Sequence, residues 1–103
     1  MNLIIIKGNP TEKPVLRYCN DDDHTPVVDF TLAVNRKKSP NSETKADFFR
    51  VVAYGGKAEF CEKYLDTKTK VIVTGSVFTG SYTDKDGVKK NSFEVHAQDI
   101  ELA

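Results

Sequence analysis

The sequence contains no tryptophan, and it has no excess of charge of either sign. Its 15 lysine and arginine residues are balanced by 15 aspartate and glutamate residues. A strongly basic domain is the usual footprint of a protein that binds nucleic acid, so this balance lowers that expectation. It does not exclude such a protein, because the placement of charges matters more than their sum. Acidic residues gather at 20–24, whereas 35–39 and 87–91 are locally basic.

Cysteines and long apolar runs are also scarce. The two cysteines, Cys19 and Cys61, are far apart and match no metal-ligand spacing, so we expect two reduced thiols rather than a disulfide. No apolar run approaches the length that crosses a bilayer, and the N-terminal MNLIII is too short for a signal sequence. These features predict a cytoplasmic protein with no membrane partner.

Groups that support catalysis are few. His24 and His96 are the only histidines, no serine or cysteine lies in a nucleophile-elbow pattern, and the glycines of YGGKAE lack the spacing of a phosphate-binding loop. The acidic residues 21–23 beside His24 are an alternative metal site, but three adjacent carboxylates converge on one ion only if the backbone turns. A solvated loop that repels anions is the preferred interpretation. We therefore expect no catalytic residue, no metal and no cofactor.

Strand signals separated by turn residues dominate what the sequence does contain. A chain of 103 residues predicts one domain, residues 1–103. Residues 2–8 form an apolar β-branched run that we expect to end at the Gly-Asn-Pro of 8–10. Residues 27–36 alternate, which predicts a half-buried strand. Its apolar face consists of Val28, Phe30, Leu32 and Val34.

The second half of the chain predicts one helix and three strands. A strand occupies residues 46–56, and the helix candidate 55–70 follows it. Four helix residues are expected to share the buried face: Ala58, Cys61, Tyr64 and Leu65. The strands 70–84 and 92–102 are joined by a hairpin turn at Asp86-Gly87.

This order of elements indicates one fold above its alternatives. An SH3-like barrel has no helix after its third strand, and a split βαβ fold needs two helices. Three strands, a short helix and two strands are the order of the OB-fold. We therefore predict an all-β protein, a five-stranded Greek-key OB-fold barrel with one short helix between strands 3 and 4.

Aromatic and basic residues share one face of the strand at 46–56. Alternation places Phe48, Arg50 and Tyr54 on one side, with Phe49 on the other. Aromatic rings with cations nearby suit single-stranded nucleic acid, because every base offers a π-face and the phosphates attract lysine and arginine. This face therefore indicates a binding surface.

The remaining aromatic residues leave some alternatives open. Singly, Phe48, Tyr54 and Tyr82 fit either a binding surface or packing beneath a loop or in a subunit interface; together with Arg50 they favour binding. A β-bulge at Phe48 would exchange its face with that of its neighbour. Three phenylalanines are expected in the core: Phe30, Phe49 and Phe60. Two fit either side: Phe78 and Phe93.

Four stretches of the chain resemble the bacterial single-stranded DNA-binding protein family, in the same order and with nearly the same spacing. They are MNLIIIKGNPTEKPVLRY, FTLAVNR, ADFFRVVAYGGKAEFCEKYL and GSYTDKDG. The resemblance covers essentially the whole chain. It implies an OB-fold, assembly as a homotetramer or dimer, and sequence-tolerant binding of single-stranded DNA in replication, recombination and repair.

The resemblance also implies roles for individual residues. Phe48, Tyr54 and Tyr82 fall where the family stacks bases, and Arg36 and Arg50 would line the phosphate path. Loop lysines complete the expected DNA-binding set: Lys37, Lys38, Lys85, Lys89 and Lys90.

The chain departs from the family in three places. Ser76 and Gly80 stand where many members have arginine, so fewer phosphate contacts and a flatter salt dependence are expected. The acidic loop 19–26 should keep DNA away from that edge. The chain stops at Ala103, so we do not expect the family's acidic tail or the repair and replication partners that it recruits. The neutral charge and the missing arginines favour an alternative, an OB-type protein-interaction module or primosomal accessory protein with weak nucleic-acid binding.

Overall fold

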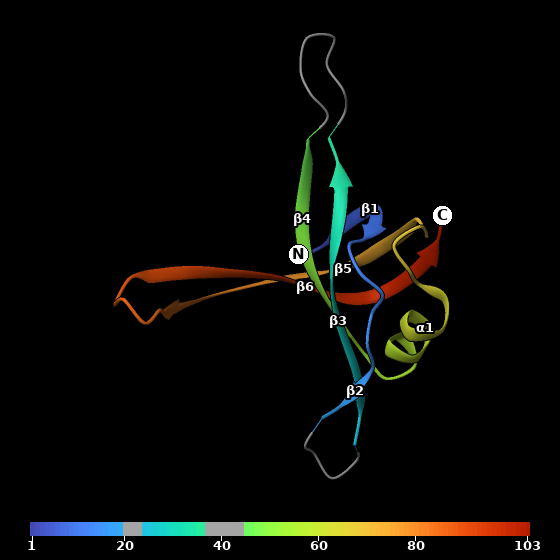
Figure 1. Cartoon of the computed structure of the whole chain (residues 1–103), viewed down its shortest axis with the longest axis horizontal. Helices are drawn as coiled ribbons and strands as arrows, with labels where there is room; N and C mark the ends of the chain where they lie inside the picture. The colour runs from blue at the N-terminus through green and yellow to red at the C-terminus, as the bar shows by residue number, and fades with distance from the viewer. Residues whose placement is uncertain (20–23, 37–44) are drawn as a thin grey trace.

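One curled sheet accounts for most of the chain in a computed structural model, which describes residues 1–19, 24–36 and 45–103. The helix α1 (Gly56–Tyr64) lies between β4 and β5. The strands are β1 (Ile4–Pro10), β2 (Arg17–Tyr18), β3 (Pro26–Asn35), β4 (Ala46–Tyr54), β5 (Val71–Thr83) and β6 (Lys89–Leu102). Figure 1 shows that β5 and β6 extend beyond the barrel as a long two-stranded arm.

The sheet closes into a barrel because β1 pairs at both of its ends. The strand order is β1-β5-β6-β4-β3, and β1 also pairs with β3. All of these pairings are antiparallel except that of β4 with β6. The predicted five-stranded OB-fold, with its helix between the third and fourth barrel strands, is confirmed. The two-residue strand β2 adds a sixth strand beside β3, in a segment that we expected to be a loop.

Closure depends on a close approach of β1 to β3 at Gly8. A Cβ atom on Gly8 would lie 2.2 Å from the carbonyl oxygen of Ala33, so only glycine fits without displacing backbone. The first strand was expected to end at the Gly-Asn-Pro of 8–10, and β1 ends at Pro10. What the sequence did not show is a change of partner within this stretch. The strand leaves β5 after Gly8 and pairs with β3 through Asn9 and Pro10 instead.

The barrel interior is apolar, as the alternation in β3 predicted. Val28, Phe30 and Leu32 are buried, and Val34 packs against them. Phe49 and Phe60 also pack against this core, which agrees with the prediction for both. The other buried residues of the cluster come mainly from β4, β5 and the helix: Ile6, Val51, Ala53, Ala58, Cys61, Leu65, Val71, Val73, Val95 and Ile100.

The register of β3 with β4 fixes which aromatic residue of β4 points outward. The pairing runs without interruption from Val27 opposite Tyr54 to Asn35 opposite Ala46, so no β-bulge exchanges the two phenylalanines. Phe48 is 66% exposed. The irregularity lies in the β5–β6 ladder instead, beside Gly75.

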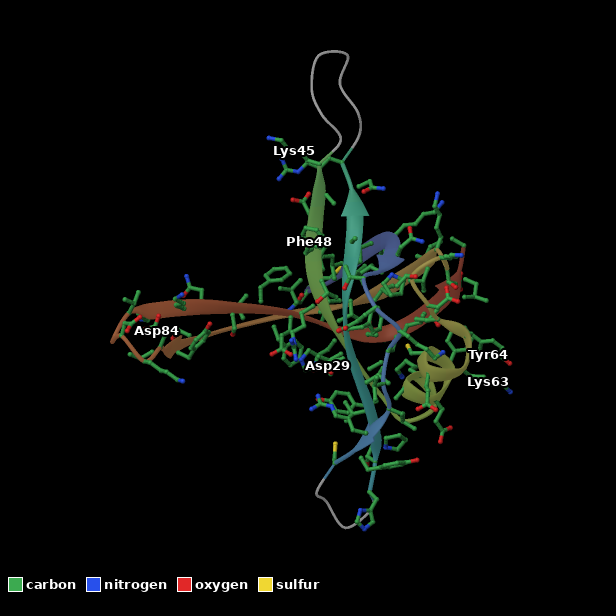
Figure 2. All side chains as sticks on the ribbon, viewed as in Figure 1. Asp29, Lys45, Phe48, Lys63, Tyr64 and Asp84 are labelled. Atoms are coloured by element: carbon green, nitrogen blue, oxygen red, sulfur yellow. The ribbon has the colours of Figure 1, made fainter. Side chains whose placement is uncertain are left out.

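Helix α1 is short, as predicted, but one of its residues was assigned to the wrong face. Ala58, Cys61 and Leu65 are buried, but Tyr64 is 49% exposed. At roughly 100° per residue, Tyr64 lies about 120° around the helix from Ala58, outside the buried stripe. Its ring packs on Phe60, with 5.0 Å between ring centroids, and points away from the barrel (Figure 2). In the described part of the chain, no helix is long and apolar enough to cross a membrane.

Substituting Gly8 with alanine tests the closure directly. The added methyl group must displace the Ala33 carbonyl, and overpacking of this kind costs about 1–3 kcal/mol. We expect Gly8→Ala to lower the free energy of unfolding by that amount in urea denaturation. Gly56→Ala is the matched control, because no atom lies within 4 Å of a Cβ placed there. Equal stability of the two variants would contradict the role assigned to Gly8.

The two cysteines should differ sharply in reactivity. Both are free thiols, as predicted. Burial raises the pKa of the Cys61 thiol to about 12, whereas the Cys19 side chain is partly exposed. Because the thiolate is the reactive form, one thiol equivalent should react with Ellman's reagent at pH 8 in the native protein, and two after denaturation. Cys19→Ser should remove the native reaction. Rapid reaction of two native thiols would contradict this prediction.

Candidate nucleic-acid interface

Four strands present a continuous surface on the outside of the barrel, which we call the outer face. Residues paired directly across a sheet project to the same side, so the register defines this face. One row runs from Thr31 through Arg50 and Glu94 to Phe78, across β3, β4, β6 and β5. The next row runs from Asp29 through Val52 and His96 to Ser76.

Three aromatic rings from three different strands converge on the outer face. The rings of Phe78 and His96 stack with 3.9 Å between centroids and 9° between their planes. On the other side of β6, the Tyr54 ring lies 6.1 Å from that of His96, tilted by 41°. Tyr54 is 44% exposed and Phe78 52% exposed, so this row of rings is open to a ligand.

Two arginines share one carboxylate beside these rings. Asp29 Oδ2 accepts a hydrogen bond from Nη2 of Arg50 and lies 3.0 Å from Nη2 of Arg17. Both guanidinium groups are more than half exposed. Since one negative charge faces two positive charges, the cluster keeps a surplus of one positive charge. The shared carboxylate also holds both arginines in place for a phosphate group.

A hollow of about 370 Å³ lies between this cluster and the end of β4. Val27 and Val52 lie buried in its lining, which explains why Val52 is inaccessible although it belongs to the outer face. Arginines and tyrosines also line the hollow: Arg17, Tyr18, Arg50 and Tyr54. Two carboxylates, Asp29 and Glu94, complete the charged part of the lining, so the hollow combines apolar groups with equal numbers of arginines and acidic residues.

Two of the predicted stacking residues lie farther out along the same face. Phe48 precedes Arg50 by two residues, and Figure 2 shows it on β4 between the barrel and the loop end of the β3–β4 hairpin. Tyr82 follows Phe78 by four residues on the same side of β5, where it is 54% exposed on the arm. The structure therefore places Tyr54 and Arg50 together and the other two rings on the projecting hairpins.

Arg36 is placed apart from this group. Its Nε and Nη2 donate hydrogen bonds of 2.9 and 2.8 Å to the two carboxylate oxygens of Asp47. These bonds hold the pKa of Asp47 below its usual value and raise the pKa of Arg36. Asp47 alternates with Phe48, so the ion pair lies on the opposite side of the hairpin. The neighbouring predicted lysines, Lys37 and Lys38, lie outside the described residues.

The three other predicted lysines lie at the far end of the arm. Lys85, Lys89 and Lys90 are exposed there, and Lys90 Nζ lies 3.5 Å from Asp84 Oδ2. The other oxygen of Asp84 accepts hydrogen bonds of 2.9 Å from the backbone N–H groups of residues 86 and 88, which orders the turn. Figure 2 shows Asp84 at this tip. The lysines thus form a basic patch separate from the arginine cluster.

The sequence prediction omitted His96 and Arg17 and left Phe78 undecided. Alternation from the core residue Val95 places His96 outward, so the orientation of its ring was accessible from the sequence. Its stacking on Phe78 was not, because the two residues are 18 positions apart and meet only through the β5–β6 ladder. Phe93 points to the other side of that ladder, where its ring lies 5.9 Å from Phe49.

No metal-binding group is found in the described ranges 1–19, 24–36 and 45–103, where no three His, Cys, Asp or Glu side chains cluster closely enough. The acidic residues 21–23, considered as an alternative metal site, lie outside these ranges.

Comparison with known proteins shows the family of the chain. The model of the single-strand binding protein family matches residues 1–103. A single-stranded DNA-binding protein of Caldanaerobacter subterraneus subsp. tengcongensis is 39% identical over 101 residues, which cover 97% of this chain and 66% of that protein. Proteins of the same name from Thermotoga maritima and Clostridium tetani are 37% and 33% identical, over 93% and 99% of this chain and 69% and 70% of their own lengths. This chain thus spans about two thirds of the length of these relatives, and it belongs to the single-strand binding protein family.

Proposed function

We propose that the outer face binds single-stranded DNA with little dependence on base sequence, by stacking bases on exposed rings and attracting phosphates to arginine and lysine. The observation that carries this proposal is the row of rings from Tyr54 to Phe78 beside the Arg17–Asp29–Arg50 cluster. Stacking platforms flanked by cations are the means by which proteins hold single strands. Membership of the single-strand binding protein family supports the same ligand.

The proposed stacking residues are Phe48, Tyr54 and Tyr82. Each is exposed on the outer face, so a base can reach it without unfolding the barrel. Phenylalanine and tyrosine offer a smaller surface than tryptophan. We therefore expect each to contribute about 1 kcal/mol per base, the low end of the usual range.

The residues proposed to contact phosphates differ in their position and in whether an aspartate already binds them. Arg50 lies at the centre of the face, and the lysines Lys85, Lys89 and Lys90 lie on the arm. Arg36 is bonded to Asp47 through Nε and Nη2, so its charge is partly neutralised before it meets a phosphate. Lys37 and Lys38, in the segment between β3 and β4, complete the proposed set.

We also propose that residues 1–103 act as one DNA-binding domain in a homo-oligomer, a tetramer or a dimer, in the cytoplasm during replication, recombination and repair. Linking several modest sites raises the overall affinity, because the second contact becomes intramolecular. Exposed apolar side chains at the start of the chain, Leu3 and Ile5, support an interface between copies.

One observation favours the second candidate, an OB-type protein-interaction module or primosomal accessory protein with weak nucleic-acid binding. Each of the three arginines in the sequence is ion-paired to an aspartate within the chain. A phosphate must compete with these carboxylates, which lowers its net gain. Measuring affinity for DNA separates the two candidates.

Removing two stacking rings tests the DNA-binding face. We expect Phe48→Ala with Tyr54→Ala to weaken binding of labelled oligo-dT by about 30-fold, the sum of two losses of about 1 kcal/mol. Fluorescence anisotropy at low and moderate salt measures this change. Tyr64→Ala is the matched control, since it removes an equally exposed ring from α1.

The outcomes separate the site from the function. Unchanged affinity of the double variant would refute the stacking assignment, and absence of binding at low salt would refute DNA binding and favour the interaction module.

Neutralising the partner of Arg36 tests whether that arginine contacts phosphate. Asp47→Asn removes the carboxylate that holds the guanidinium, so one more cation becomes available to the strand. The slope of log affinity against log salt should steepen by about 0.7. Asp66→Asn is the control, because it changes the net charge equally at a carboxylate bonded to residues 68 and 69 instead of an arginine. Equal slopes in the two variants would assign the effect to net charge alone.

A further inference from the structure

His96 occupies the centre of the outer face, yet the proposed stacking set does not include it. Its strand, β6, lies between β4 and β5, so its ring has a neighbour on each side. Phe78 covers one side of the imidazole in a parallel stack, and Tyr54 stands 6.1 Å away on the other. Since Phe78 is itself exposed, this stack is a surface feature and not part of the core.

We propose that His96 contacts a base of the bound strand and that binding is tighter when its imidazole is protonated. This inference rests on the proposed role of the outer face and adds a further DNA-contacting residue to it. The ligand is a nucleobase with its adjoining phosphate, held between the imidazole and the ring of Tyr54.

The spacing of the rings suits a base in that position. A flat base between two parallel rings needs about 7 Å between their centroids, because each stacking contact takes roughly 3.5 Å. From the present separation of 6.1 Å and tilt of 41°, the exposed Tyr54 side chain must rotate toward the parallel orientation and move slightly outward. Phe78 already holds the imidazole in place by stacking on its other side. His96 therefore loses little conformational freedom when DNA binds.

The charges around His96 determine the sign of the pH dependence. Glu94 Oε2 lies 4.0 Å from His96 Nε2, and Arg50 and Tyr54 face it from β4. From β5 it meets the uncharged Ser76 and Phe78. A bound phosphate adds negative charge to this surface, which favours the protonated imidazole.

The coupling between proton binding and DNA binding determines whether affinity rises or falls with pH. Histidine side chains change charge between about pH 5 and 8. If DNA prefers the protonated form, binding takes up a proton, and affinity must rise as the pH falls through this range.

The decisive experiment compares His96→Phe with the unaltered chain. Phenylalanine retains a flat ring for Phe78 and the base but carries no titrating proton. Anisotropy with labelled oligo-dT, at pH 6 and pH 8 and constant ionic strength, should show about fivefold tighter binding at pH 6 for the unaltered chain. We expect His96→Phe to bind at both pH values with the same affinity, and His96→Ala to bind more weakly at both because the ring is lost.

Three controls accompany this experiment. His24→Gln removes the other histidine and should leave the pH dependence intact. Calorimetry in buffers of different ionisation enthalpy should show proton uptake on binding for the unaltered chain and none for His96→Phe. Circular dichroism of each variant checks that it is folded.

The outcomes distinguish this inference from the proposed function. Retention of the full pH dependence in His96→Phe, or its loss in His24→Gln, overturns the role of His96. So does unchanged binding of His96→Ala while the Phe48→Ala, Tyr54→Ala variant is weakened, and the outer face then still stands as the DNA site. Absence of oligo-dT binding by the unaltered chain at low salt overturns both.

Discussion

The pairing of β1 with two different strands is the constraint on which the rest of the structure depends. Its first residues bond to β5 and its last two to β3, and Gly8 makes the crossing possible by leaving room for the Ala33 carbonyl. This closure joins the two ends of the sheet and gives it a single enclosed side. Because side chains alternate along each strand, enclosing one side commits the other to solvent. The outward position of the binding residues follows from it.

The outer face also explains how a chain with no net charge can present cations to a polyanion. Its two arginines, Arg17 and Arg50, are held by Asp29 of a neighbouring strand, so they are oriented but partly neutralised. The Asp29 cluster keeps a surplus positive charge, whereas the Arg36–Asp47 pair is neutral. Stacking on exposed rings does not depend on that balance. The geometry therefore favours a DNA strand whose bases contact the middle of the outer face. Its phosphates would then lie near Arg50 and the lysines of the arm.

Sequence reasoning succeeded where a residue's environment follows from its own strand. It correctly placed Phe48 outward and Phe49 toward the core. The alternation holds there because the β3–β4 register is uninterrupted. It failed where a second segment decides the outcome. The Gly-Asn-Pro sequence marks where the first strand leaves β5, but the sequence did not show that Asn9 and Pro10 go on to pair with β3. The placement of Tyr64 in the core was a different kind of error, because the helical period alone puts this residue about 120° from Ala58 and outside the buried stripe.

By itself, the sequence determined the order of elements, the two faces of each long strand and, through its resemblance to a family, the class of ligand. Only the tertiary structure decided which outward residues meet. Tyr54, Phe78 and His96 come from β4, β5 and β6, and Arg17, Asp29 and Arg50 come from β2, β3 and β4. Alternation says on which side of a strand a residue lies, but not which residue of another strand lies beside it. That depends on long-range register and on the closure of the barrel, which are properties of the whole fold.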